Sequence, residues 1–296
     1  MAAWSGPQAG KFQTRRGAIS TTGEKPDRYA VVGHPIEHSR SPVIHQLFAS
    51  QTGQNIVYEL IDAVPEAFET AVRGFAAAGG KGLNVTVPHK QAAYELCHEL
   101  GPEAEKARAV NTISFSADGR LRGDNTDGIG FMRDLTEILD EPVEGRRVLV
   151  LGAGGAARGI LLPLVEAAPG ELVLANRTIE RADVMIGELD PTDSLSARTF
   201  AALADEPPFD IIINATSAGV RGEELPFSPN CVGPDTLCYD LAYSLKDTPF
   251  VLWARANGVR EAAQGWGMLV EQAAESFFIW RGIRPDTAPI LEKLRR

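Results

Sequence analysis

Four short polar segments of this sequence contain the side chains with the clearest capacity for chemistry. They are Gly33–Pro42, Asn84–Lys90, Ala109–Thr112 and Gly123–Gly128. In a domain of alternating strands and helices, the loops that lead from a strand to a helix gather along one edge of the sheet, where ligands bind. We therefore expect these segments to form one site for a small-molecule substrate.

Lys90 and Asp127 are the residues in these segments with the strongest indication of a catalytic role. Pro88 stops an expected strand and places Lys90 in the first turn of the next helix. The helix dipole disfavours a purely structural lysine there, and a lysine amine can act as a general acid or base. Asp127 stands at another helix start, from which its carboxylate could hold Lys90. We predict that the two form the catalytic pair.

Two of these residues could instead have a purely structural role. Ser41 precedes a proline at an expected helix start, so it could be only an N-cap. Asp127 could be only a partner of a helix dipole. Asn84 and Thr86, in contrast, are two apart on an expected strand and should share one face. Four such loops together favour a binding site over separate structural roles.

The segment from Val148 to Gly159 is typical of a dinucleotide-binding unit. Val148–Leu151 is an apolar strand, and Gly152, Gly154 and Ala157 follow it with the spacing of a turn that opens a helix. Such a turn lets the backbone approach a pyrophosphate, which the helix N-terminus then stabilises. The residues that we expect at the cofactor are Gly152, Ala153, Gly154, Gly155 and Ala156.

The end of the second strand of this unit predicts which dinucleotide binds. Leu172–Ala175 is followed by Asn176, Arg177 and Thr178, with Arg181 shortly after, and no acid stands there to accept a ribose 2′-hydroxyl. Two arginines can instead hold a 2′-phosphate. They could also be ordinary surface arginines, but the dipole disfavours them at a helix start. We therefore predict NADP as the cofactor.

Strands and helices alternate along most of the chain, which predicts an α/β fold with largely parallel sheets. The first series is expected as strands 29–33, 56–61, 82–87, 111–115 and 121–124, and helices 42–52, 65–78, from 88, and 126–139. After a turn-rich break at 141–145, the second is expected as strands 147–151, 172–175, 210–214 and 236–240, and helices 155–168 and 179–188. A last helix, 264–280, is not needed by the nucleotide unit and is expected to return to the first domain.

Composition narrows the class of protein further. The chain has 296 residues, a net charge of −10 and three cysteines. The negative charge argues against nucleic-acid binding, and no apolar run reaches the length of a membrane span. The few cysteines suit a cytoplasmic protein, and no cluster of ligands predicts a metal site. Residues 1–28 have a biased polar composition and are expected to be a disordered tail.

Taken together, the motifs resemble those of the shikimate dehydrogenase family from Tyr29 to Pro289. The shared motifs, in order, are HPIEHSRSP, NVTVPHK, AVNT, GDNTDG, LGAGGAARG, NRT, NATSAG, YDLAYS and GMLVEQAA. The resemblance implies reduction of 3-dehydroshikimate to shikimate with NADPH, in chorismate and aromatic amino-acid biosynthesis. It also implies a discontinuous substrate domain (29–139 and 265–296), a Rossmann-type doubly wound NADP domain (140–264), and a monomer or homodimer.

The same resemblance implies roles for individual residues. Lys90 would be the acid/base and Asp127 its partner, while Ser39 and Ser41 would bind the substrate carboxylate. The residues implied around the ring are Thr86, Asn111, Asp127 and Gln272, with Asn84 and Tyr243 lining the site. Those implied beside the cofactor are Leu241, Gly265 and Met268. Leu241, His34 and His89 depart from the residues most common in the family, which have Met, Asn and Phe there.

Two other functions remain open at this point. A related enzyme could act on quinate, which has one more ring hydroxyl, and could use NAD. A non-enzymatic metabolite sensor could keep the fold, but loss of Lys90 or Asp127 would be expected in it, and both are present.

Overall fold

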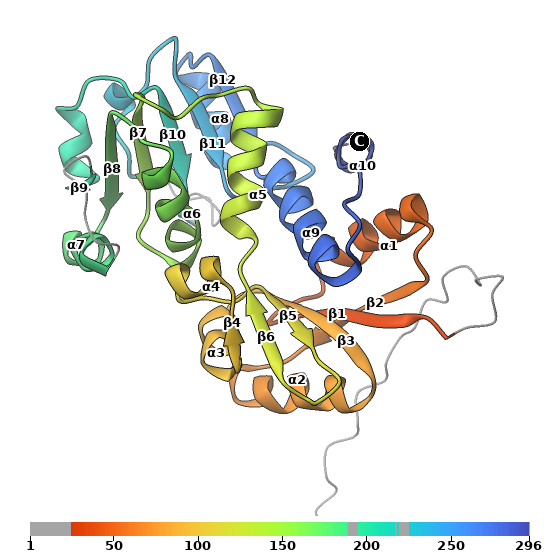
Figure 1. Cartoon of the computed structure of the whole chain (residues 1–296). Coiled ribbons are helices and arrows are strands. Elements are labelled where there is room, and N and C mark those ends of the chain that lie inside the picture. The colour runs from red at the N-terminus through yellow and green to blue at the C-terminus, as the bar shows by residue number, and fades with distance from the viewer. Residues whose placement is uncertain (1–24, 189–194, 217, 219–224, 296) are drawn as a thin grey trace, which may run out of the picture.

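A computed structural model of the chain describes residues 25–188, 195–216, 218 and 225–295. Two α/β domains lie side by side, each built on a six-stranded sheet (Figure 1). Helices α5 (Asp127–Arg133) and α9 (Trp266–Arg281) stand between the two sheets in this view. The expected tail lies largely outside the described residues, but Asp27 and Arg28 belong to the first strand, so the expected tail boundary at 28 is wrong.

The first sheet has the order β2-β1-β3-β5-β6-β4. Its strands are β1 Asp27–Gly33, β2 Ile56–Asp62, β3 Gly80–Val85, β4 Glu99–Leu100, β5 Thr112–Phe115 and β6 Leu121–Asp124. Strand β5 runs antiparallel to both β3 and β6, and the other pairs are parallel. The short connection between β5 and β6 permits only a hairpin, because a parallel crossover needs many more residues.

The second sheet is parallel throughout, in the order β12-β11-β10-β7-β8-β9, which confirms the Rossmann-type prediction. Its strands are β7 Arg147–Leu151, β8 Glu171–Asn176, β9 Leu195–Thr199, β10 Ile211–Asn214, β11 Leu237–Asp240 and β12 Glu261–Gln264. Four of these follow the expected ranges to within one residue at each end. The edge strands β9 and β12 were not predicted, because they are short and carry few apolar residues.

Ten α-helices are assigned within the described part of the chain. They are α1 Ser41–Thr52, α2 Phe68–Ala77, α3 Lys90–Leu96, α4 Pro102–Ala107, α5 Asp127–Arg133, α6 Gly155–Glu166, α7 Ile179–Glu188, α8 Pro249–Ala256, α9 Trp266–Arg281 and α10 Ala288–Leu294. Short 3₁₀ turns occupy Pro65–Ala67, Ala201–Ala204 and Pro229–Cys231, and a π-helical segment, Asp134–Ile138, continues α5. None of these helices is long and apolar enough to cross a membrane.

Three local predictions near the site need correction. Ser41 is the first residue of α1 and not its N-cap, which is Arg40. Strand β3 ends at Val85, so Thr86 lies just beyond the strand that was expected to contain it. The expected helix 126–139 is α5 followed by the π-helical segment.

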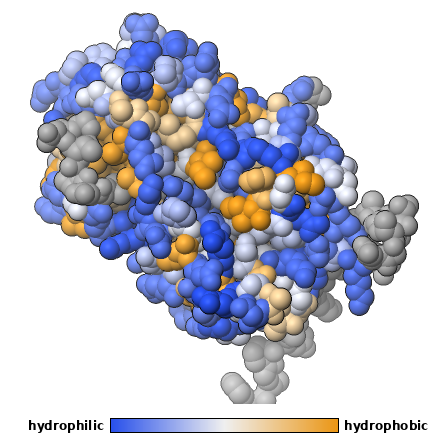
Figure 2. All heavy atoms as spheres, in the orientation of Figure 1, coloured by the Kyte–Doolittle hydropathy of each residue, from blue (hydrophilic) through white to orange (hydrophobic). Residues whose placement is uncertain are grey.

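Alternation along the central strands builds the core. In β1, Tyr29 and Val31 pack with α1 and α9, whereas Ala30 and Val32 pack with α2 on the opposite face. Strand β7, buried from Val148 to Leu151, divides its apolar side chains between two clusters in the same way. The outer surface is mostly hydrophilic, with apolar residues gathered toward the middle of the face drawn in Figure 2.

Two glycines let α5 lie against a helix of each domain. A Cβ atom on Gly128 would come within 2.6 Å of Pro163 in α6, and one on Gly130 would come within 2.5 Å of the backbone nitrogen of Gln272 in α9. The GDNTDGIG sequence therefore brings Asp127, which begins α5, next to both domains.

Candidate active site

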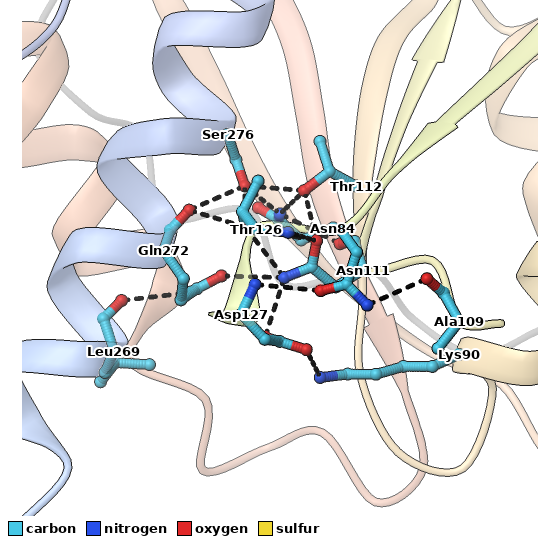
Figure 3. A network of polar contacts seen from close by, with 11 residues as sticks. Asn84, Lys90, Ala109, Asn111, Thr112, Thr126, Asp127, Leu269, Gln272 and Ser276 are labelled. Atoms are coloured by element: carbon cyan, nitrogen blue, oxygen red, sulfur yellow. Dashed lines mark hydrogen bonds and ion pairs between the residues drawn. The ribbon is translucent and has the colours of Figure 1, made fainter. Parts of the chain in front are cut away.

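The predicted catalytic residues form an ion pair. The Nζ atom of Lys90 lies 2.5 Å from Oδ2 of Asp127, although the residues are 37 positions apart in the sequence (Figure 3). Lys90 begins α3 and Asp127 begins α5. Their side chains are 30% and 13% exposed, so the amine remains accessible to a ligand while the carboxylate is largely enclosed.

Asn111 orients the carboxylate of this pair. Its Nδ2 group donates to Oδ1 of Asp127 at 2.9 Å, and its Oδ1 atom accepts from the backbone N–H of Thr126 at 2.9 Å. The Oε1 atom of Gln272 lies 3.5 Å from the same Nδ2 group. Each oxygen of Asp127 thus has its own donor, and the side chains of Asn111 and Gln272 meet beside it.

A buried polar layer supports Asn111. Asn84 accepts a hydrogen bond from the hydroxyl of Tyr58 at 2.6 Å and donates to Oγ of Ser276 at 2.9 Å and to the backbone oxygen of Asn111 at 3.2 Å. Thr112 and Ser276 share a further hydrogen bond. Figure 3 shows the side chains of Asn84, Thr112 and Ser276 converging from β3, β5 and α9. Asn84 therefore has its hydrogen bonds largely filled by protein.

Sequence reasoning missed Tyr58, Thr126 and Ser276 in this layer. Ser276 could have been found, because it stands one helical turn after Gln272 and so lies on the same face. Tyr58 carries no comparable signal, since it is one of several aromatic residues in the strands.

Ser39 and Ser41 stand together where the first polar segment enters α1. The hydroxyl of Ser39 lies 3.2 Å from that of Ser41 and also accepts from the backbone N–H of Ser41. Two hydroxyls at this spacing can hydrogen bond to the two oxygens of one carboxylate.

One cleft of about 680 Å³ brings nearly all of these groups together. It is lined by nine residues predicted for catalysis or substrate binding: Ser39, Ser41, Asn84, Thr86, Lys90, Asn111, Asp127, Tyr243 and Gln272. Leu241, Gly265 and Met268, predicted beside the cofactor, line it as well. His38, Arg40, Ser244 and Trp266 also line it but were not predicted.

The glycine turn has the geometry that a nucleotide requires. Gly152 has φ of +99°, and a Cβ atom on it would lie 2.7 Å from the side chain of Thr216. No atom of the described residues lies within 4 Å of the positions that Cβ atoms of Gly154 and Gly155 would occupy. Because α6 begins at Gly155, the open space lies at a helix N-terminus, where backbone N–H groups can bind phosphate.

The residues after β8 lie at the same end of the second sheet. The amide oxygen of Asn176 accepts from the backbone N–H of Ala153 at 3.3 Å, which ties β8 to the glycine turn. Arg177 and Arg181 are exposed, and neither side chain makes an ion pair with an acid in the described residues. Their positive charges are thus available to a ligand. Ser217 and Gly219, of the predicted NATSAG motif, lie outside the described residues.

The fold and cleft together define a class of protein. A dinucleotide-binding sheet faces a cleft that contains a lysine–aspartate pair and several hydroxyl and amide groups, which is the arrangement of a pyridine-nucleotide oxidoreductase with two α/β domains. No group of three or more possible metal ligands occurs within the described ranges.

Comparison with known families specifies the class. Residues 31–113 match the family Shikimate dehydrogenase substrate binding domain, residues 134–221 match Shikimate / quinate 5-dehydrogenase, and residues 265–295 match Shikimate 5'-dehydrogenase C-terminal domain. The chain belongs to the shikimate dehydrogenase family.

Individual relatives agree with that assignment. The Shikimate dehydrogenase (NADP(+)) of Alkalilimnicola ehrlichii is 55% identical over 91% of this chain and 98% of its own length. The Ael1 enzyme from Pseudomonas putida has a similar crystal structure, with a TM-score of 0.85 and 45% identity over 91% of this chain and 98% of that one. A shikimate 5-dehydrogenase from Thermus thermophilus, solved with NADP(H) and shikimate, has a TM-score of 0.81 and 33% identity over 91% and 99% of the two chains.

Proposed function

We propose that this protein catalyses the reversible, NADP-dependent reduction of 3-dehydroshikimate to shikimate, a step of aromatic amino-acid biosynthesis. The observation that carries the proposal is the Lys90–Asp127 pair, held at 2.5 Å in a cleft next to a nucleotide-binding sheet. The Thermus thermophilus relative, which binds both NADP(H) and shikimate, supports it.

Proton transfer is the part of the reaction that Lys90 performs. NADPH, when bound, would supply the hydride for the carbonyl carbon of the substrate. The electron pair of the carbon–oxygen π bond moves to oxygen, and the ammonium group of Lys90 donates the proton that this oxygen needs. Asp127 holds the ammonium in position and stabilises its charge. In the direction of alcohol oxidation, neutral Lys90 accepts the hydroxyl proton.

The other cleft residues bind and orient the substrate. Ser39 and Ser41 hydrogen bond to its carboxylate, since their hydroxyls are adjacent. The ring hydroxyls contact Thr86, Asn111, Asp127 and Gln272, while Tyr243 closes the side of the cleft. Asn84 acts mainly through Asn111, because its own amide is already bonded to Tyr58 and Ser276.

The residues around the glycine turn fit NADP. The pyrophosphate binds Gly152, Ala153, Gly154, Gly155 and Ala156 at the start of α6. Asn176, Arg177, Thr178 and Arg181 hold the adenosine ribose and its 2′-phosphate. Leu241, Gly265 and Met268 contact the nicotinamide end. Arg177 and Arg181 have no acidic partner among the described residues, and the sequence has no acid at the end of β8; both features support NADP over NAD.

Catalysis also requires that the two domains close over the cleft. We assign residues 27–139 and 265–296 to the substrate domain, which begins with β1, and residues 140–264 to the cofactor domain. Helix α9 then returns the chain to the first domain, where its Gln272 meets Asn111. Closure of the domains brings nicotinamide and substrate together and excludes water.

A crossed assay tests the function. Absorbance at 340 nm is followed with shikimate or quinate, each with NADP or NAD. The expected result is the highest kcat/KM with shikimate and NADP. A higher kcat/KM with quinate and NAD would assign the chain to the quinate enzymes, and no turnover of either acid would overturn the proposal.

A further inference from the structure

Arg40 contributes a positive charge to the cleft, and no acidic residue in the described ranges pairs with it. The charged residues of the lining are Arg40, Lys90 and Asp127. Lys90 and Asp127 pair with each other at 2.5 Å, whereas the guanidinium of Arg40 has no ion-pair partner in the part of the chain that the structure describes. The whole chain has a net charge of −10, so a positive cleft wall differs in sign from the molecule as a whole.

The position of Arg40 connects this charge with the two serines. Arg40 stands between Ser39 and Ser41 and forms the N-cap of α1, where its backbone oxygen accepts from Ile44 N–H at 3.1 Å. The hydroxyls of the serines can donate hydrogen bonds to a carboxylate but bring no charge. The three residues are consecutive where the chain enters α1, so the Arg40 side chain extends from a residue that adjoins both serines.

Tyr243 is a second residue of the cleft lining that interacts with the charge of Arg40. Burial raises the pKa of the Tyr243 hydroxyl, and the charge of Arg40 partly opposes that rise. Both residues line the cleft, Arg40 from the first sheet's domain and Tyr243 from the loop after β11. The two side chains therefore border the same space.

We propose that Arg40 is a specificity-determining residue, which selects substrates with a free carboxylate over uncharged analogues. This inference rests on the proposed function. It assigns to Arg40 the charge complementarity that neutral serine hydroxyls cannot supply, because an ionised partner makes a stronger and longer-ranged interaction with a carboxylate than a hydroxyl does. Since Arg40 is exposed, solvent screening limits the effect to about tenfold in KM.

The test compares shikimate with its methyl ester, which keeps the ring hydroxyls and lacks the charge. The variants are Arg40→Gln and Arg40→Lys, with Lys81→Gln as a matched control that removes one exposed charge outside the cleft. For Arg40→Gln we expect KM for shikimate to rise about tenfold, with kcat little changed and kcat/KM for the ester within about twofold of the parent. Arg40→Lys should retain most of the preference for the acid, and Lys81→Gln all of it.

Each other outcome has a defined meaning. If Arg40→Gln keeps the parent's ratio of kcat/KM for acid and ester, the inference is overturned. If the variant instead raises KM for NADP and leaves that for shikimate unchanged, Arg40 serves the cofactor, and the inference is again overturned. Absence of shikimate turnover by the parent enzyme would refute the proposed function itself, which separates the two failures.

Discussion

The carboxyl group of Asp134 accepts a hydrogen bond from the hydroxyl of Tyr239 at 2.5 Å and another from the backbone N–H of Met268 at 2.9 Å. Asp134 begins the π-helical segment after α5, Tyr239 lies in β11, and Met268 lies in the first turn of α9. A Cβ atom on Gly267 would overlap the carboxylate at 1.9 Å. One buried acid thus joins three elements where the domains meet, next to a residue assigned to the nicotinamide.

Tyr239→Phe should destabilise the protein, and more so as pH rises. Burial raises the pKa of Asp134, while the Tyr239 hydroxyl and the Met268 N–H oppose that rise. A carboxyl group whose folded pKa lies above its unfolded value stabilises the fold fully at low pH, and this stability is lost as pH rises through the folded pKa. Removing the Tyr239 hydroxyl raises the folded pKa of Asp134 further. The free energy of unfolding at neutral pH then falls by about 1–3 kcal/mol more than in the parent.

Urea unfolding of parent and variant from pH 4 to 8 measures this difference. Tyr94→Phe is the control, since no hydrogen bond of the Tyr94 hydroxyl occurs among the described residues, and it should change little. A loss for Tyr239→Phe that is the same at every pH would contradict the assignment to Asp134.

Lys90→Ala should abolish proton transfer and spare binding. We expect kcat to fall by a factor of about 10² to 10⁴, the usual contribution of a general acid or base. Binding of shikimate, measured by calorimetry, should remain, because the serine pair and the Asn111 network do not depend on the lysine. Activity equal to that of the parent would exclude the role.

Arg177→Ala combined with Arg181→Ala should weaken the binding of NADP selectively. Each arginine can make a charge-assisted contact with the 2′-phosphate, so KM for NADP should rise by about two powers of ten. KM for NAD should hardly change, because NAD has no such phosphate. Steady-state kinetics with both cofactors provide the measurement, and equal effects on the two would count against the cofactor assignment.

Gly130→Ala should disturb both stability and substrate binding. The new Cβ would lie 2.5 Å from the backbone nitrogen of Gln272, so α5 and α9 must move apart, at a cost of about 1–3 kcal/mol. Because Gln272 is displaced, KM for shikimate should rise as well. Gly74→Ala, in the open middle of α2, is the matched control and should stabilise by about 0.5–1 kcal/mol. Urea unfolding and steady-state kinetics of both variants measure these effects. Equal changes in stability and in KM for shikimate in Gly130→Ala and Gly74→Ala would refute the packing argument.

His45 should make the fold sensitive to mild acid. Burial lowers its pKa to about 3, and its ring stacks on Tyr58 with centroids 4.2 Å apart. The unfolded chain takes up a proton below a pKa of about 6.5, whereas the folded chain resists it, so stability falls as pH drops from about 6.5 towards 3. At pH 5 the loss from this group is about 2 kcal/mol. His45→Phe keeps the stacking, and should show correspondingly less loss between pH 7 and 5 in urea unfolding; an unchanged pH profile would be inconsistent with this account.

Much of the secondary structure follows from local sequence. Strand β7 and helix α7 have the expected bounds, because an unbroken apolar run and a helical period are each complete within a few neighbouring residues. Strand β12, with the sequence EAAQ, has no such pattern. It becomes a strand because β11 offers it a free edge, which is a property of the assembled sheet.

The candidate site, like the secondary structure, follows from the sequence only in part. The sequence by itself determined which side chains stand in the polar loops, that a glycine turn opens α6, and that two arginines follow β8 without an acid. Only the tertiary structure decided that Asn84 is enclosed by Tyr58 and Ser276, that Arg40 lines the cleft with no ion-pair partner among the residues the structure describes, and that Asp134 joins the domains. Motifs depend on residues adjacent in the chain, whereas the distance between Asn111 and Gln272, 161 positions apart, depends on the tertiary packing that brings α9 beside the segment leading into β5.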